Sequence, residues 1–139
     1  MQVHASCAAK DGAGVLLLGP PGAGKSDMVL RLMDHGFVLV ADDRVEIVDG
    51  YAGPADGLAG LLEVRGLGIF RLPHLAAARL RLAVSLGPVA ARLPEPAREA
   101  ATALPLVTVD PSRPSAARVV ALALDGALGR ITQVAGAFA

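Results

Sequence analysis

The chain lacks several residue types that would point to common functional classes. Only one of its 139 residues is a cysteine, so no disulfide can form within the chain, and a reducing compartment is allowed. Aromatic residues make up 3% of the sequence, which argues against the base-stacking platforms of nucleic-acid binders. There is no asparagine at all, so the Asn-Lys-x-Asp motif that a GTPase needs is missing.

The balance of charge and the short hydrophobic runs argue against a nucleic-acid-binding, membrane-bound or secreted protein. Thirteen basic residues balance thirteen acidic ones, which leaves no strongly basic surface for nucleic acid or an anionic membrane. No apolar run is long enough to span a bilayer, and the N-terminus has no basic cluster ahead of an apolar core, as a signal peptide would. We therefore expect a cytoplasmic protein that forms a single domain over residues 1–139.

The clearest motif that is present is a phosphate-binding loop. It reads Gly19-Pro20-Pro21-Gly22-Ala23-Gly24-Lys25-Ser26 and fits G-x-x-x-x-G-K-[S/T] without a mismatch. In such loops glycines let backbone N–H groups face phosphate oxygens, and the helix that follows adds its positive N-terminus. Lys25 would reach the β- and γ-phosphates and the Ser26 hydroxyl would hold Mg²⁺. The pattern predicts that residues 19–26 bind a nucleoside triphosphate.

Turn chemistry and periodicity predict the elements around this loop. Residues 2–9 and 15–18 are expected to be the strands of a hairpin that turns at 10–14. A helix is expected over 24–35, ended by Gly36, with an apolar stripe of Met28, Val29, Leu32 and Met33 toward the sheet. The apolar run 37–41 is typical of a buried strand, and a short right-handed crossover should make it parallel to strand 15–18.

Two adjacent carboxylates, Asp42 and Asp43, follow that buried strand directly. Ligands of open α/β sheets bind at the carboxyl ends of the strands, so both side chains should reach the edge where the phosphates lie. Because successive strand residues point to opposite faces, one Asp should face the phosphate loop and the other should face away or into the turn.

The remainder of the chain carries weaker signals. Strands are expected at 45–49, 80–86 and 104–109, a loop at 50–60, and weak helical character at 97–102. Ser115 is a suitable N-cap for a helix over about 116–128, whose apolar face would comprise Val119, Val120, Ala123 and Leu124. In the segment 61–69, Glu63 and Arg65 would share one face if the chain is extended.

Together these motifs resemble the catalytic domain of bacterial HPr kinase/phosphorylase. That family has an LVADD strand end at this distance from its loop, as at residues 39–43, and an E-x-R-G-L-G-I signature, as at residues 63–69. It also has a histidine upstream of the loop, which falls on His4. Near its end the family often reads V-R-P-G-R-N, of which the chain keeps Val109, Pro111 and Arg113. The resemblance extends from His4 to about residue 124.

The resemblance implies a fold and an activity. The fold would be α/β, a P-loop nucleotide-binding domain like that of HPr kinase and PEP carboxykinase, with a mixed central sheet flanked by helices. The activity would be transfer of the γ-phosphoryl group from ATP, with Mg²⁺, to a serine of the phosphocarrier protein HPr. Some members also run the reverse phosphorolysis, in which phosphate releases pyrophosphate. The family assembles as homohexamers, and because its usual N-terminal domain has no counterpart here, the chain looks like a short form or a fragment.

The resemblance also assigns roles to single residues. Asp43 matches the acid/base residue, and His4 matches a catalytic histidine that would tune it. Glu63 matches a second Mg²⁺ ligand beside Ser26, and Asp42 would hold a metal-bound water or Lys25.

Three arginines and the catalytic lysine complete the expected site. Lys25 supplies positive charge to the transferred phosphoryl group, and Arg92 falls near the position of a catalytic arginine. Arg65 and Arg113 would bind phosphate by bidentate contacts.

The same residues also fit alternative roles. The loop alone would suit a small-molecule kinase or NTP hydrolase, or a regulator that binds ATP without catalysis. As alternatives, Glu63 and Arg65 would make a surface ion pair, Asp42 and Asp43 would cap a strand-ending turn, and His4 would be a half-exposed strand residue. Arg92 and Arg113 would equally be solvated surface residues.

Overall fold

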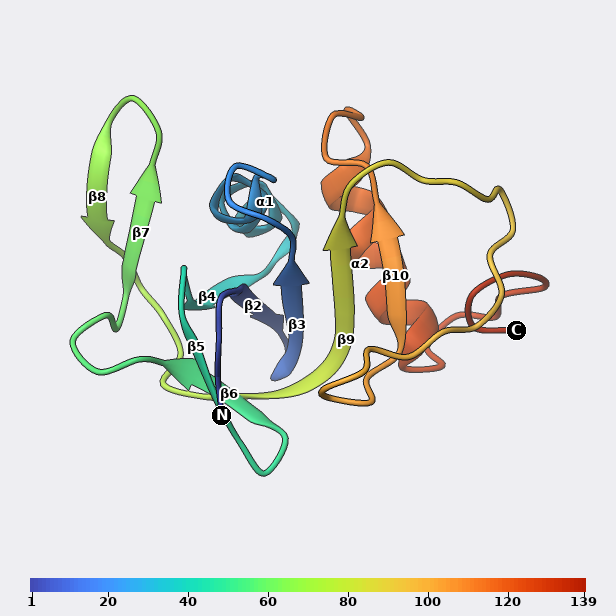
Figure 1. Ribbon diagram of the computed structural model, residues 1–139, viewed down its shortest axis with the longest axis horizontal. Coiled ribbons are helices and arrows are strands. Elements are labelled where there is room, and N and C mark those ends of the chain that lie inside the picture. The colour runs from blue at the N-terminus through green and yellow to red at the C-terminus, as the bar shows by residue number, and fades with distance from the viewer.

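The computed structural model describes residues 1–139 and is dominated by one mixed β-sheet (Figure 1). Its eight strands are β1 (Gln2–Val3), β2 (Ser6–Lys10), β3 (Ala13–Leu18), β4 (Val38–Ala41), β5 (Val45–Val48), β6 (Tyr51–Pro54), β9 (Ala78–Leu86) and β10 (Leu106–Val109). The spatial order is β1-β5-β6-β9-β3-β2-β4, with β10 also paired to β9. Because β3, β9 and β10 are parallel, their carboxyl ends meet at one edge, the top of Figure 1.

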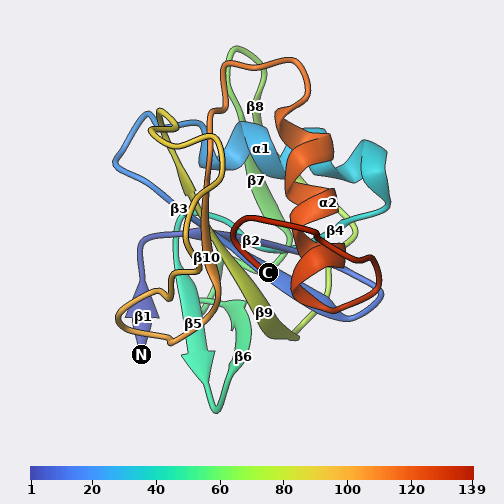
Figure 2. The same ribbon diagram turned by 90° about the vertical axis from the view of Figure 1, so that its right-hand side faces the viewer.

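The helices and a separate hairpin complete the fold. The helices are α1 (Lys25–Leu32), a short 3₁₀ turn η1 (Met33–His35) and α2 (Ala116–Ala127). Strands β7 (Leu61–Val64) and β8 (Gly68–Arg71) pair only with each other and stand beside α1 (Figure 1). Figure 2 shows α1 and α2 on the same side of the sheet, so the predicted mixed sheet is present, with both helices on one face.

The predicted hairpin ahead of the phosphate loop is confirmed for residues 6–18, but residues 2–9 do not form one strand. Gln2–Val3 form β1, which pairs with β5, and His4 lies exposed in the bend between β1 and β2. Strands β2 and β3 pair antiparallel, and their turn is made by Asp11 and Gly12 with φ of 51° and 80°. Helix α1 also matches its prediction, since Met28, Val29 and Leu32 are buried and the turn after it ends at Gly36 with φ of 84°. A positive φ there is the left-handed conformation that glycine adopts at no steric cost.

Strand β4 has the predicted direction but a different neighbour. It pairs antiparallel with β2, which itself pairs antiparallel with β3. Two successive antiparallel pairings make β4 parallel to β3, while β2 lies between them. Strand β2 therefore touches both the strand that leads into the phosphate loop and the strand that ends at the acidic pair.

The secondary structure predicted for two further segments was wrong. Residues 51–54 were expected to lie in a loop but form β6, because Asp49 and Gly50 make a tight turn with φ of 51° and 81° and β6 then pairs with both β5 and β9. Residues 97–102 are not helical. The carboxylate of Glu99 accepts hydrogen bonds from the N–H groups of Ala101 and Thr102 and closes a local turn instead.

Helix α2 begins where predicted, but its buried face differs in part. Ser115 occupies the N-cap position, yet its side chain makes no capping hydrogen bond. Val119, expected on the apolar face, is exposed. The buried side chains are Ala116, Ala117, Val120, Ala121 and Leu124.

The hydrophobic core has one cluster on each face of the sheet. The larger one lies under the helices and joins Met28, Val29 and Val120 to the sheet and to Leu62 of β7. The smaller one contains Cys7, Leu16 and Val40. Burial raises the pKa of the Cys7 thiol from 9.0 to about 12, against a smaller opposing effect of a backbone hydrogen bond with Val15. None of the helices has the length and hydropathy needed to cross a bilayer.

Candidate nucleotide and phosphoryl-transfer site

The loop between β3 and α1 presents backbone donors that have no partner in the protein. Gly22 and Gly24 have φ of 84° and 97°, conformations that only glycine adopts readily. The N–H groups of Gly22, Gly24, Lys25 and Ser26 donate no hydrogen bond to any protein acceptor. Four free amide donors at the N-terminus of a helix are the arrangement that binds phosphate oxygens.

The ammonium group of Lys25 adds positive charge at the same place. Its Nζ donates to the carbonyl oxygens of Gly19 at 2.7 Å and Pro20 at 3.1 Å, so the side chain folds back over its own loop. It forms no ion pair with a carboxylate. The loop therefore offers one uncompensated cation together with its free amides, which suits a polyphosphate.

Asp42 lies directly against this loop, as one of the two predicted carboxylates should. The Ser26 hydroxyl donates to its Oδ1 at 2.7 Å and its Oδ2 at 2.9 Å, and the hydroxyl of Ser6 donates to Oδ1 at 2.7 Å. Asp42 is only 9% exposed, and no Lys, Arg or His forms an ion pair with it. Buried charges are normally paired or coordinate a metal, so this carboxylate fits a site that receives a cation.

The donor set suits Mg²⁺ bound together with a nucleotide rather than a protein-only metal cage. Nowhere do three His, Cys, Asp or Glu side chains gather closely enough to hold a metal. Mg²⁺ is commonly held by one or two oxygen side chains, substrate phosphates and waters. Ser26 and Asp42 supply such oxygens, and the free amides of the loop supply the place for the phosphates.

Asp43, the next residue, leaves the strand and enters the turn, as predicted for the second carboxylate. It is exposed and has φ of 68°, a left-handed conformation uncommon for non-glycine residues. Its carbonyl oxygen accepts the N–H of Ala5 at 3.3 Å, which places the backbone of the neighbouring His4 next to it. No hydrogen bond or ion pair joins the side chains of His4 and Asp43.

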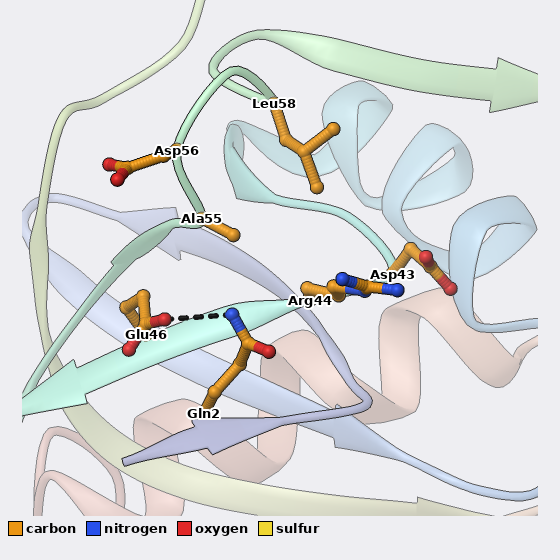
Figure 3. A pocket seen from close by; sticks show the side chains of 7 residues that line it. All are labelled: Gln2, Asp43, Arg44, Glu46, Ala55, Asp56 and Leu58. Atoms are coloured by element: carbon orange, nitrogen blue, oxygen red, sulfur yellow. Dashed lines mark hydrogen bonds between the residues drawn. The ribbon is translucent and has the colours of Figure 1, made fainter.

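A cavity of about 580 Å³ opens beside Asp43 (Figure 3). Residues from β1, the β4–β5 turn, β5 and the loop after β6 line it: Gln2, Asp43, Arg44, Glu46, Ala55, Asp56 and Leu58. Figure 3 shows Asp43 and Arg44 on one side, with the Asp43 carboxylate directed away from the other labelled side chains, and the hydrogen-bonded pair Gln2 and Glu46 on the other side with Asp56. The cavity and the exposure of Asp43 leave room beside this residue for a second molecule.

The signature segment at 61–69 folds differently from the expectation. Glu63 is exposed on β7, but Arg65 lies in the turn between β7 and β8, so the two are not on one face of an extended strand. They form no ion pair. The buried side chain of Leu62 anchors the hairpin in the cluster beneath α1. The structure does not link Glu63 to Ser26 or Asp42 by any hydrogen bond.

The loop after β10 also lies against the phosphate loop. The guanidinium of Arg31 on α1 donates to the carbonyl oxygen of Pro111 at 3.1 Å, and Pro111 lies close to Gly24. Asp110 accepts the hydroxyl and the N–H of Ser112, and these bonds, with a smaller contribution from Arg113, lower the pKa of its carboxyl. Arg113 itself is exposed in this loop.

Arg92 is the predicted residue with the least structural connection to the site. It is exposed in the long segment between β9 and β10 and makes no hydrogen bond or ion pair. In Figure 1 this segment leads from the top of β9 away from α1.

Sequence reasoning missed two residues at this site. Ser6 contacts Asp42 from β2, and Arg31 holds the loop that follows β10. A serine inside an apolar strand was a usable signal for Ser6. Arg31 gave no signal, since a basic residue near the end of a helix is common.

Comparisons with known proteins point to one family. The family model described as HPr Serine kinase C-terminal domain matches residues 1–79. An HPr kinase/phosphorylase from Brevibacillus brevis is 46% identical over 66 residues, which is 44% of this chain and 21% of the relative. One from Bordetella pertussis is 48% identical over 63 residues, 42% of this chain and 20% of the relative. The chain thus spans about a fifth of the length of these curated relatives.

A solved structure extends the likeness of fold beyond residue 79. The Hpr(Ser) kinase/phosphatase from Coxiella burnetii superposes with a TM-score of 0.77 over 94% of this chain and 92% of that chain, at 22% identity. At this identity the match concerns the fold. His4, the phosphate loop, Asp42, Asp43 and the 61–69 segment lie within the residues matched by the family model, whereas Arg92 and Arg113 lie outside them.

Proposed function

Because this chain belongs to the family of the HPr serine kinase C-terminal domain, we propose that it is an ATP-dependent protein-serine kinase whose acceptor is a serine of the phosphocarrier protein HPr. The observation that carries the proposal is the hydrogen bond between Ser26 and Asp42. It joins the phosphate loop to the acidic strand end, which supports a position for Asp43 near the γ-phosphate of a bound nucleotide.

On this proposal the phosphate loop and Lys25 bind the phosphates of ATP. The amides of Gly22, Gly24, Lys25 and Ser26 would donate to phosphate oxygens, and Lys25 would move from the loop carbonyls to the β- and γ-phosphates. Mg²⁺, when bound, would neutralise charge on the transferred group. Ser26 and Asp42 would hold it, and Glu63 would approach as a further oxygen ligand once the hairpin closes on the nucleotide.

Asp43 would act on the acceptor side. Its carboxylate would take the proton from the serine hydroxyl while the serine oxygen forms a bond to the γ-phosphorus and the bond to the β–γ bridging oxygen breaks. General-base assistance of this kind contributes about 10²–10⁴-fold. The exposure of Asp43 and the cavity beside it support this assignment, because they leave the residue open to a loop of another protein. His4 would lie next to Asp43 and tune its proton affinity.

The remaining cations are proposed as phosphate contacts. Arg113 would approach the phosphates from the loop that packs on Gly24, and Arg65 from the tip of the hairpin. Arg92 would need its segment to move toward the loop. In the reverse direction, an oxygen of inorganic phosphate would attack phosphoserine, pyrophosphate would form, and Asp43 would return the proton to serine. We further propose a cytoplasmic homohexamer, as the resemblance implies.

The test is a transfer assay with a matched control. The full chain is mixed with ATP, Mg²⁺ and HPr, and phosphoserine on HPr is measured by mass spectrometry. Asp43→Asn should keep ATP binding but reduce transfer by at least about a hundredfold. Asp49→Asn is the control, because Asp49 is also exposed with a positive φ (51°) but lies in the β5–β6 turn. It should transfer like the parent chain.

Different assay results would point to different functions. ATP hydrolysis that does not require HPr would indicate an NTPase or small-molecule kinase. ATP binding without hydrolysis or transfer would indicate a regulator. Transfer that persists in Asp43→Asn would show that another group takes the proton. Adding inorganic phosphate to phosphorylated HPr and assaying pyrophosphate tests the reverse reaction.

A further inference from the structure

Ser6 is a buried polar residue in an otherwise apolar part of the sheet. Its side chain is fully buried on β2, where its neighbours in sequence are Ala5 and Cys7. Its hydroxyl donates to Oδ1 of Asp42 at 2.7 Å. Burying a hydroxyl is costly unless it is hydrogen-bonded, so the contact with Asp42 is what makes a serine tolerable here.

The backbone on both sides fixes where the Ser6 hydroxyl lies. Ser6 pairs with Leu17 on β3, close to the start of the phosphate loop. The next residue, Cys7, pairs with Ala41 at the end of β4, which brings Ser6 beside Asp42. Because β2 lies between β3 and β4, Ser6 lies between the strand that leads into the phosphate loop and the strand that ends at Asp42.

The hydrogen bond with Ser6 limits how the Asp42 carboxylate can turn. A carboxylate rotates easily about its last side-chain bond, where the torsional preference is broad. Here Oδ1 accepts from Ser6 and Ser26, while Oδ2 accepts from Ser26 alone. The Ser26 hydroxyl belongs to the phosphate loop. The hydrogen bond from Ser6 is therefore the only side-chain hydrogen bond that a strand of the sheet donates to the Asp42 carboxylate.

We propose that Ser6 is a positioning residue for the metal-binding end of the nucleotide site. Its hydroxyl locks the carboxylate of Asp42 in the orientation that directs Ser26 to the Mg²⁺ of the bound nucleotide. This role rests on the proposed function, since it requires a nucleotide–metal complex at the loop. Mg²⁺ demands near-ideal octahedral geometry, whereas Ca²⁺ accepts irregular coordination. Loosening Asp42 should therefore weaken Mg²⁺ binding much more than Ca²⁺ binding.

The experiment compares two cations on the same protein. The affinity of the full chain for a fluorescent ATP analogue is titrated with Mg²⁺, with Ca²⁺ and with EDTA, for the parent chain, Ser6→Ala, Ser6→Cys and Ser6→Thr. The matched control is Cys7→Ala, which removes a fully buried side chain from the next position of β2 without touching Asp42. Each variant is measured below its own melting temperature, recorded separately.

A selective loss of Mg²⁺-dependent binding is expected. Ser6→Ala and Ser6→Cys should lose about tenfold in Mg²⁺-dependent affinity, the effect of one hydrogen bond to a charged group, and less than about threefold with Ca²⁺. Ser6→Thr restores the hydroxyl and should recover most of the Mg²⁺ effect, and Cys7→Ala should match the parent chain with both cations.

Two results would overturn the positioning role. Equal losses with Mg²⁺ and Ca²⁺ in Ser6→Ala would mean that the serine only supports the fold, and so would failure of both Ser6→Ala and Ser6→Cys to fold. A parent chain whose affinity for the analogue does not depend on a divalent cation would instead refute the proposed function, which separates the two failures.

Discussion

The backbone of Asp43 gives a sharp prediction about stability at the site. Asp43 has φ of 68°, yet its exposed side chain makes no hydrogen bond and no ion pair. Removing the side chain therefore costs no contact, and the backbone conformation alone should decide how a substitution changes the free energy of unfolding. Asp43→Gly and Asp43→Ala separate that effect from the chemistry, since both remove the carboxylate.

The expected magnitude follows from two opposing costs. A left-handed conformation costs an ordinary L-residue about 1–2 kcal/mol, which glycine avoids. Glycine loses about 0.5–1 kcal/mol more conformational entropy on folding than alanine does. Asp43→Gly should therefore be more stable than Asp43→Ala by about 0.5–1 kcal/mol, which corresponds to about 2–4 °C in melting temperature for a chain of this size.

The assay is urea unfolding followed by circular dichroism, together with the HPr transfer assay. Asp49 provides the control pair, because it has φ of 51° and is also exposed. Asp49→Gly should exceed Asp49→Ala in stability by a similar amount, with transfer unchanged. Both Asp43 variants should be inactive. If Asp43→Gly is no more stable than Asp43→Ala while the Asp49 pair differs as expected, the strain assigned to Asp43 is wrong.

Two further predictions concern the core. Leu62→Ala should lower the free energy of unfolding by about 2–5 kcal/mol and speed hydrogen exchange in residues 61–71, because Leu62 is the buried anchor of the β7–β8 hairpin; Ile69→Ala, at a 70% exposed position, should do neither. The pKa of Cys7 is raised to about 12 by burial, so the unfolded chain loses the thiol proton at a lower pH than the folded chain does. The Cys7 contribution to stability should thus be intact below pH 9 and fall between pH 9 and 12, by at most about 1.4 kcal/mol per pH unit. Urea unfolding across that range should show a steeper decline for the parent chain than for Cys7→Ala, and equal slopes would contradict the assigned cause.

Local chemistry made much of the fold predictable. The turn at Asp11 and Gly12, the stop of the first helix at Gly36 and the phosphate loop all depend on residues close together in sequence. The orientation of the acidic pair was also predictable, since the two residues follow a strand and successive side chains alternate. Asp42 faces the loop and Asp43 enters the turn.

Segments whose structure depends on distant partners were predicted less well. β6 contains Gly53 and Pro54, which argue for a loop, but pairing with β5 and β9 makes it a strand. The segment that carries Arg65 is a different case: Glu63 and Arg65 would share a face only if the segment were extended, but Gly66, with φ of 86°, turns the chain there through local backbone conformation. The expected roles of Glu63, Arg65, Arg92 and Arg113 stay predictions, because the structure does not join their side chains to the loop.

The sequence by itself determined the phosphate-loop motif, the strand that leads into it and the carboxylates that follow the next buried strand, because each is encoded by spacing over a few residues. Only the tertiary structure decided that β2 lies between β3 and β4, and hence that Ser6 meets Asp42. The physical reason is that strand order is set by which apolar faces pack together across the whole sheet. No local pattern in the residues of β2 records which strand will lie on its other side.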